Sequence, residues 1–154
     1  MEKTIGFDNL KMGQRVKVKG KPAEGNNFSA LEISIKPGDE EAALEGKIQS
    51  LDPEKNTLRL MNRDFALNGS VEIKNVQRQP IALKNLKPGD IVKLKGPYSA
   101  SSGFTPAKVK MQESKGFNIE ELQGGINKID SAQKTLDILG FTVMVNDKTE
   151  IAGF

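Results

Sequence analysis

The chain of 154 residues has no cysteine, no histidine and no tryptophan, and it has a single tyrosine. The absence of cysteine excludes a disulfide scaffold, thiolate metal ligands and a cysteine nucleophile. The absence of histidine removes the commonest general base and the commonest zinc ligand, so most hydrolase triads and zinc sites are excluded. We therefore expect a protein that is not an enzyme and that uses no cofactor.

Long apolar runs and strong net charge are also missing. No apolar run reaches the roughly 20 residues that a membrane-spanning helix needs. The first ten residues, MEKTIGFDNL, lack the basic and apolar regions of an export signal, so we expect either a cytoplasmic protein or a segment of a longer one. The formal charge of +3 arises from 23 basic and 20 acidic side chains that are mixed along the chain. This balance indicates a mildly basic surface rather than a dedicated nucleic-acid binder.

Two stretches of the chain occur twice. FDNLKMGQRVKVKG at 7–20 is similar to LKNLKPGDIVKLKG at 83–96, and LEGKIQSLDPEKNTLRL at 44–60 is similar to LQGGINKIDSAQKTLDI at 122–138. The offsets are 76 and 78 residues, which is about half of the chain. A period of this length indicates a duplicated small domain and is too long for a solenoid repeat.

The phase of the repeat predicts where the domains lie. Residues 45–122 contain one complete unit, whereas residues 1–44 and 123–154 each contain half of another. Separate halves would expose unpaired strand edges, so we expect the two chain ends to close on each other as a composite barrel around a continuous middle barrel. The alternative is a cut through a longer tandem array, with ends that are frayed or swapped between molecules. The chain is therefore expected to be a monomer or a domain-swapped dimer.

The hydrophobic pattern alternates with the period of a β-strand. Extended segments are expected at 46–52, 57–61, 64–73, 91–96 and 104–111, with one helical turn in LKNL at 83–86. The linkers 36–46 and 113–124 could each hold a further helical turn. Five strands with a short helical plug fit an OB-like barrel, because closure removes the sheet edges. The predicted fold class is therefore all-β, with two tandem OB-like five-stranded β-barrels.

The order of these strand and turn signatures resembles a bacterial β-barrel family, domain of unknown function 5666. The matching positions are Gly46 with Ile48, Thr57 with Leu58, Val71 to Ile73, Leu83 to Val92, and Ala107 with Met111. Val71 stands where the family has threonine, and Gln14 stands where the middle unit has Asp90. The resemblance implies tandem copies and an extracytoplasmic setting, periplasmic or secreted, within a longer parent protein. It transfers no activity and no functional residues.

Lysines that alternate with apolar residues are the strongest functional feature. They could form a basic stripe that follows a phosphate backbone, or they could be the solvated face of an antiparallel sheet, where lysine also discourages edge pairing. Residues 45–122 carry a net charge of +4, and the remaining residues carry −1. The candidate ligand-binding residues are therefore in the middle barrel: Arg59, Arg63, Lys93, Lys95, Tyr98, Lys108 and Lys110.

Two groups of carboxylates have alternative interpretations. Asp39, Glu40 and Glu41 could ligate a hard cation, or Asp39 could cap a short helix. Asp52 and Asp130 could be paired for acid/base chemistry, although each also stands where aspartate accepts backbone hydrogen bonds in a turn. We favour the structural interpretation of both groups and predict no metal site and no catalytic residue.

The function that these features favour is a non-catalytic binding or structural module that contacts an unknown protein, glycan or cell-envelope partner. The alternative is an OB-fold protein that binds single-stranded nucleic acid on the basic face of the middle barrel, with Tyr98 as the stacking residue.

Overall fold

The computed structural model describes residues 3–4, 6–36, 42–67, 71–99, 103–113 and 119–153. Within these ranges the chain is mostly strand, and its only helices are the 3-10 turns η1 (Phe7–Asn9) and η2 (Leu83–Asn85). The strands before η2 are β1 (Lys3–Thr4), β2 (Arg15–Pro22), β3 (Asn27–Ile35), β4 (Ala42–Asp52), β5 (Thr57–Leu60), β6 (Arg63–Ala66) and β7 (Glu72–Lys74). Those after it are β8 (Ile91–Gly96), β9 (Tyr98–Ser99), β10 (Gly103–Phe104), β11 (Lys108–Gln112), β12 (Glu120–Asp130), β13 (Thr135–Ile138), β14 (Phe141–Met144) and β15 (Glu150–Gly153). The all-β prediction is confirmed. Among the described residues, no helix has the length and apolar character to span a bilayer.

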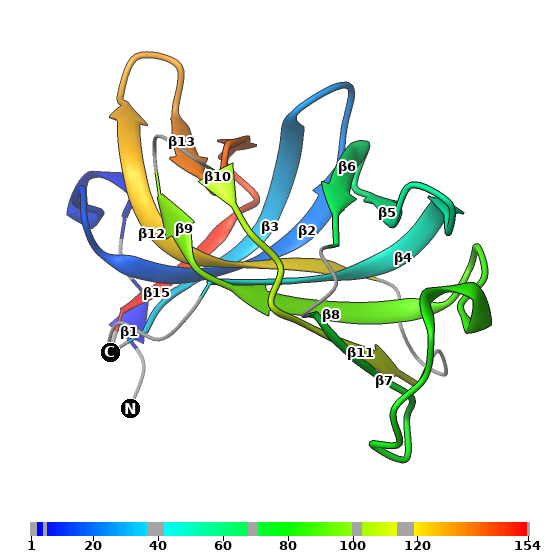
Figure 1. Cartoon of the computed structure of the whole chain (residues 1–154). Coiled ribbons are helices and arrows are strands. Elements are labelled where there is room, and N and C mark those ends of the chain that lie inside the picture. The colour runs from blue at the N-terminus through cyan, green and yellow to red at the C-terminus, as the bar shows by residue number, and fades with distance from the viewer. Residues whose placement is uncertain are drawn as a thin grey trace.

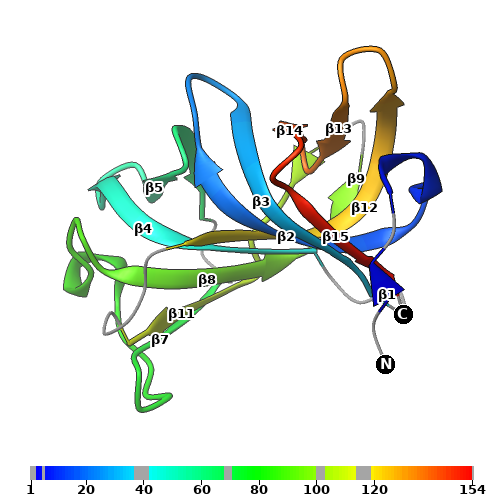
Figure 2. The same ribbon diagram turned by 180° about the vertical axis from the view of Figure 1, so that it is seen from behind.

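Five strands from the two ends of the chain form a closed barrel, which we call the end barrel. β2 pairs with β3, β3 with β14, β14 with β13, β13 with β12, and β12 pairs back to β2. β15 continues parallel to β3, and the short β1 lies beside β15, so the first and last strands are neighbours (Figures 1 and 2). Closure leaves β2 and β12 with partners on both sides, as a barrel requires.

The strands between these ends form the middle unit, whose sheet runs in the order β6, β5, β4, β8, β11 and β7. In the described residues, the ladder does not continue from β6 to β10 or β11, although Phe65 meets Phe104 edge-on at 5.9 Å between ring centroids. The strand expected at 104–111 is interrupted between β10 and β11. The physical reason is Pro106, which has no amide hydrogen for a ladder. The OB-like class and the duplication stay predictions.

A ladder between β4 and β12 joins the end barrel to the middle unit (Figure 1). The two strands are antiparallel, with Leu44 opposite Leu122, and both side chains are buried. Within the two linkers, residues 42–46 and 120–124 belong to strands whose backbones pair across this junction. The helical turns that the linkers could hold stay predictions for residues 37–41 and 114–118, which lie outside the described residues. The proposed domain boundaries at 45 and 122 fall within the same ladder, and they stay a prediction.

The turns before β2 and β8 have the same local structure. The Asn9 side chain accepts a hydrogen bond from the Gly6 amide (3.0 Å), and Asn85 accepts one from the Ala82 amide (2.9 Å). The helical turn predicted within LKNL is confirmed at η2. A second turn follows each 3-10 turn. In the first copy Gln14 Oε1 accepts a hydrogen bond from the Lys11 amide (2.7 Å), and in the second Asp90 Oδ2 accepts one from the Lys87 amide (3.0 Å). Glutamine thus replaces aspartate without loss of the bond.

The alternation along β2 and β8 places apolar side chains in the core and lysines outside. Val16, Val18, Val92 and Leu94 are fully buried, while the lysines between them lie on the outer face. Each buried aliphatic side chain stabilises the fold by roughly 1.5–3 kcal/mol. A slip of one residue would reverse the two faces, so the core fixes the direction in which the lysines point.

Candidate functional site

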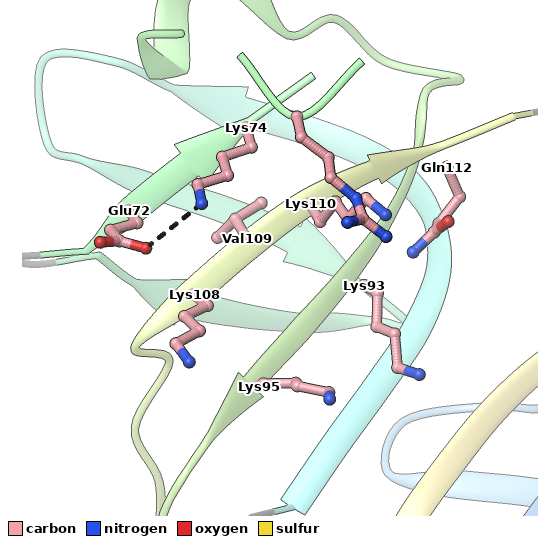
Figure 3. Close-up of a pocket in the computed structure, with 9 residues that line it drawn as sticks. Glu72, Lys74, Lys93, Lys95, Lys108, Val109, Lys110 and Gln112 are labelled. Carbon is pink, nitrogen blue, oxygen red and sulfur yellow. Dashed lines mark ion pairs between the residues drawn. The ribbon is translucent and has the colours of Figure 1, made fainter. Parts of the chain in front are cut away.

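A basic hollow of about 570 Å³ lies on the outer face of β7, β8 and β11 (Figure 3). Six of its nine lining residues are cations: Lys74, Arg78, Lys93, Lys95, Lys108 and Lys110. The other three are Glu72, Val109 and Gln112. The hollow therefore gathers four of the seven candidate residues, those that the lysine alternation had assigned to one face.

The strand register sets the lysines directly beside one another. Lys108 is opposite Lys95, and Lys110 is opposite Lys93, in the antiparallel ladder of β8 and β11. On its other side, Lys110 is opposite Lys74 of the parallel strand β7. Neighbouring strands lie about 4.8 Å apart, and alternate residues of one strand lie about 7 Å apart. The cations thus form a grid whose spacing is set by the backbone.

Among the described residues that line the hollow, Glu72 is the one with a carboxylate. The Glu72 side chain is opposite Lys108 in the register and lies 4.0 Å from the Nζ atom of Lys74 (Figure 3). Both members of this ion pair are largely exposed, so the pair contributes little to stability. One acid among six cations leaves the hollow strongly positive, and such a concave surface attracts anions.

Tyr98 lies elsewhere. It is half-buried on β9, packs against the hydrophobic core and does not line the hollow. Burial and the Asp137 carboxylate raise the pKa of the Tyr98 hydroxyl, and Arg63 opposes that shift. None of the described residues that line the hollow is aromatic, so these residues offer no platform for base stacking.

Arg59 and Arg63 are also outside the hollow. Arg59 forms an ion pair with Asp64 at 3.0 Å between β5 and β6. Arg63 extends from β6 to the end barrel, where its guanidinium donates to the carbonyl oxygens of Leu139 (2.8 Å) and Gly140 (2.9 Å). The same guanidinium lies 4.5 Å from the centroid of the Phe141 ring. Burial lowers the pKa of Arg63, and Tyr98 and Asp137 oppose that shift. This residue holds the two parts of the molecule together.

The carboxylates with alternative interpretations behave as turn residues where they are described. Asp52 Oδ1 accepts the backbone amides of Glu54 (3.1 Å) and Lys55 (3.3 Å), and Asp130 Oδ1 accepts that of Gln133 (3.1 Å). Asp39, Glu40 and Glu41 lie outside the described residues. No group of three potential metal ligands occurs in the ranges that the structure describes.

Sequence reasoning missed Lys74, Arg78 and Gln112. The alternation of Glu72, Ile73 and Lys74 indicated which face Lys74 occupies, but it could not show that β7 lies parallel to β11. Arg78 follows β7 in a turn and has a positive φ of 66°, which no local pattern indicated. Long-range pairing, rather than any local motif, brings these residues to the hollow.

Residues 1–34 and 45–109 match the model of a family described as a domain of unknown function (DUF5666). The match covers most of the middle unit. In the end barrel it covers strand β2 and most of strand β3. It does not establish tandem copies. Neither a curated protein nor a solved structure matches the chain.

Proposed function

Because the chain belongs to the DUF5666 family, whose description assigns no activity, we propose a function from the geometry: a non-catalytic binding module that holds an acidic glycan in the basic hollow. An acidic glycan here means a polysaccharide that carries sulfate, phosphate or carboxylate groups. The lack of histidine and cysteine supports a role without catalysis.

The observation that carries this proposal is the pair of like-charged contacts between β8 and β11. Lys95 faces Lys108 and Lys93 faces Lys110 directly across the ladder. Like charges in directly opposite positions destabilise a sheet. A face that serves only solubility gains nothing from this arrangement, since acids could alternate with the lysines. An anionic ligand relieves the repulsion, so the grid is favourable when it is occupied.

Lysine, rather than arginine, dominates the hollow, with five lysines to one arginine. Lysine is a compact, flexible point charge, whereas arginine offers a planar fork for bidentate recognition. Point charges on a regular grid suit repeated anionic groups on a sugar chain. Single-stranded nucleic acid is the second candidate, and the same cations favour it, but proteins that bind it usually add aromatic stacking. Among the residues that the structure describes, none that lines the hollow provides such stacking.

An extracytoplasmic location is part of the proposal. The family resemblance implies export, and acidic glycans are constituents that a periplasmic or secreted module would meet. A module of this kind would act within a longer parent protein, anchoring it to the polymer rather than modifying the polymer.

Binding of a sulfated oligosaccharide, measured by titration calorimetry at several salt concentrations, tests the function. We expect measurable affinity whose logarithm falls linearly with the logarithm of salt concentration. The variant K93Q/K95Q should lose about tenfold in affinity, because each neutralised contact releases counterions. Its control is K84Q/K87Q, which removes two exposed lysines outside the hollow.

Three outcomes would overturn the proposal: no affinity at low salt, affinity that is independent of salt, or equal losses in the two variants. An oligonucleotide of matched charge is titrated in parallel. Tighter binding of the oligonucleotide than of the oligosaccharide would replace the glycan by single-stranded nucleic acid.

A further inference from the structure

The outer face that carries the hollow continues across the junction into the end barrel. The row of Lys74, Lys110 and Lys93 meets Glu45 on β4, which is directly opposite Lys93. On its other side, Glu45 is directly opposite Glu121 of β12. The positive row therefore ends at two adjacent carboxylates.

Cations resume beyond these carboxylates. Glu121 is opposite Lys19 of β2, and its Oε1 atom lies 3.4 Å from the Nζ atom of Lys17. The side chain of Glu121 is only 16% exposed, and that of Lys17 is 31% exposed, so this pair is better shielded than the Glu72–Lys74 pair. Lys17 and Lys19 thus lie beside an acid of the junction, whereas Lys110 of the hollow has a lysine directly opposite on each side.

The two carboxylates are themselves an unfavourable pair. Glu45 and Glu121 occupy directly opposite positions, where like charges repel. Burial and the neighbouring Glu121 raise the pKa of Glu45, and Lys93, Lys17 and Lys19 oppose that shift. Strand pairing at the junction does not require this arrangement, because the next pair on the same side of the ladder, Ala43 with Gln123, carries no charge.

We propose that Glu45 and Glu121 form an acidic boundary that ends the anion-binding surface at the junction and confines a bound glycan to the middle unit. The inference rests on the proposed function and names the residues that set the length of the ligand. Without the two carboxylates, a polyanion could follow cations from β7 across β11 and β8 to Lys17 and Lys19 on β2. The step from β8 to β2 crosses three inter-strand spacings, about 14 Å in all.

The boundary predicts a limit to the useful length of the ligand. A sulfated oligosaccharide that covers the three strands of the hollow makes every favourable contact, and a longer one meets the repulsion of two carboxylates. For the wild-type chain, affinity should rise with oligosaccharide length and then reach a plateau. In the variant E45Q/E121Q, the plateau should move to longer chains, and affinity for the longest should rise about tenfold as two further lysines are neutralised.

A matched control comes from the end barrel. Glu32 and Glu150 are also directly opposite each other, on β3 and β15, but they lie beyond Lys19 from the hollow. The variant E32Q/E150Q removes the same charge from a cross-strand glutamate pair. It should leave the plateau length unchanged, because the boundary still stands between the hollow and β2. Thermal unfolding of both variants verifies that each is folded.

The dependence of affinity on salt gives a second readout. The slope of log affinity against log salt counts the neutralised charges, so it should steepen for the longest oligosaccharide in E45Q/E121Q and not in E32Q/E150Q. An unchanged plateau and slope in E45Q/E121Q would overturn the boundary, as would an equal change in the control. If no oligosaccharide of any length binds the wild-type chain, the proposed function itself fails, which is a distinguishable result.

Discussion

The outer faces of the end barrel and the middle unit share a strand register but differ in charge. Lys17 and Lys19 of β2 correspond in the repeat to Lys93 and Lys95 of β8. The partners of Lys17 and Lys19 on β3 are Ser34 and Glu32, whereas the partners of Lys93 and Lys95 on β11 are both lysines. On the third strand, Ala152 of β15 and Lys74 of β7 occupy the corresponding positions.

This difference separates what the fold needs from what the hollow adds. The end barrel forms the same ladders with a serine, a glutamate and an alanine at the three positions. Lysine at the corresponding positions of the middle unit is therefore not a requirement of strand pairing. The three extra cations increase repulsion on one face only, and this asymmetry is the feature that a ligand would explain.

The largest effect is expected when the charge pattern of the end barrel replaces that of the hollow. The variant K74A/K108E/K110S removes three cations and adds an acid, so its affinity for a sulfated oligosaccharide should fall about hundredfold. The free energy of unfolding should rise by about 0.5 kcal/mol, because three like-charged cross-strand pairs are lost while K108E places one acid opposite Glu72. Calorimetry and urea unfolding measure the two quantities. Parallel losses of affinity and stability would mean that the lysines are structural.

A smaller effect, on stability, is expected when the connection between the two regions is removed. Arg63→Ala deletes the donors to the Leu139 and Gly140 carbonyls and the contact with Phe141. Urea unfolding should show a loss of about 2–3 kcal/mol, because two backbone carbonyls lose a charged partner. The matched control is Arg59→Ala, whose exposed ion pair with Asp64 contributes less than about 1 kcal/mol. Equal losses would show that Arg63 does not link the regions.

The smallest effect concerns protonation at the junction of the two regions. The pKa of Glu45 is raised by burial and by Glu121, so the folded state binds the proton more tightly than the unfolded state does. The resulting stabilisation is present below the ordinary pKa of glutamate and is lost as pH rises through the higher pKa of Glu45. Relative to E45Q, the wild-type chain should lose stability over that window. Thermal unfolding of both chains across the window measures the stability of each, and a wild-type stability that rises with pH relative to that of E45Q contradicts the prediction.

The sequence predicted the faces of the strands better than their neighbours. Alternation along a strand follows from the pleat, so Val16 and Val18 could be assigned to the core and the lysines to the outside. The helical turn within LKNL could also be predicted, because its hydrogen bonds are local. These local rules account for the all-β class and for four of the five lysines of the hollow.

The remaining features depend on contacts between distant segments. Strand pairing between segments that are dozens of residues apart brings Lys74 beside Lys110 and Glu45 opposite Glu121. No local pattern in the sequence predicts such pairing. Tyr98 and Arg63 were candidates for ligand binding because they are a loop aromatic and a strand cation. The hydrogen bonds of Arg63 to Leu139 and Gly140, and the partial burial of Tyr98 against the core, could not be inferred from their neighbours in the sequence.

The closed ring of paired strands in the end barrel also determines when its strands can pair during synthesis. β2 and β3 leave the ribosome long before β12 to β15, so the outer edge of β2 has no partner until nearly the whole chain exists. The middle unit can form while the edge of β2 is still unpaired. Pairing of β2 with β12 joins distant segments of the chain, and such long-range pairing is slow. The unpaired strand β2 carries Lys17, Lys19 and Lys21, and charged side chains on a strand edge discourage pairing with other chains. We therefore expect the lysines of β2 to discourage such pairing during synthesis, independently of any ligand of the folded protein.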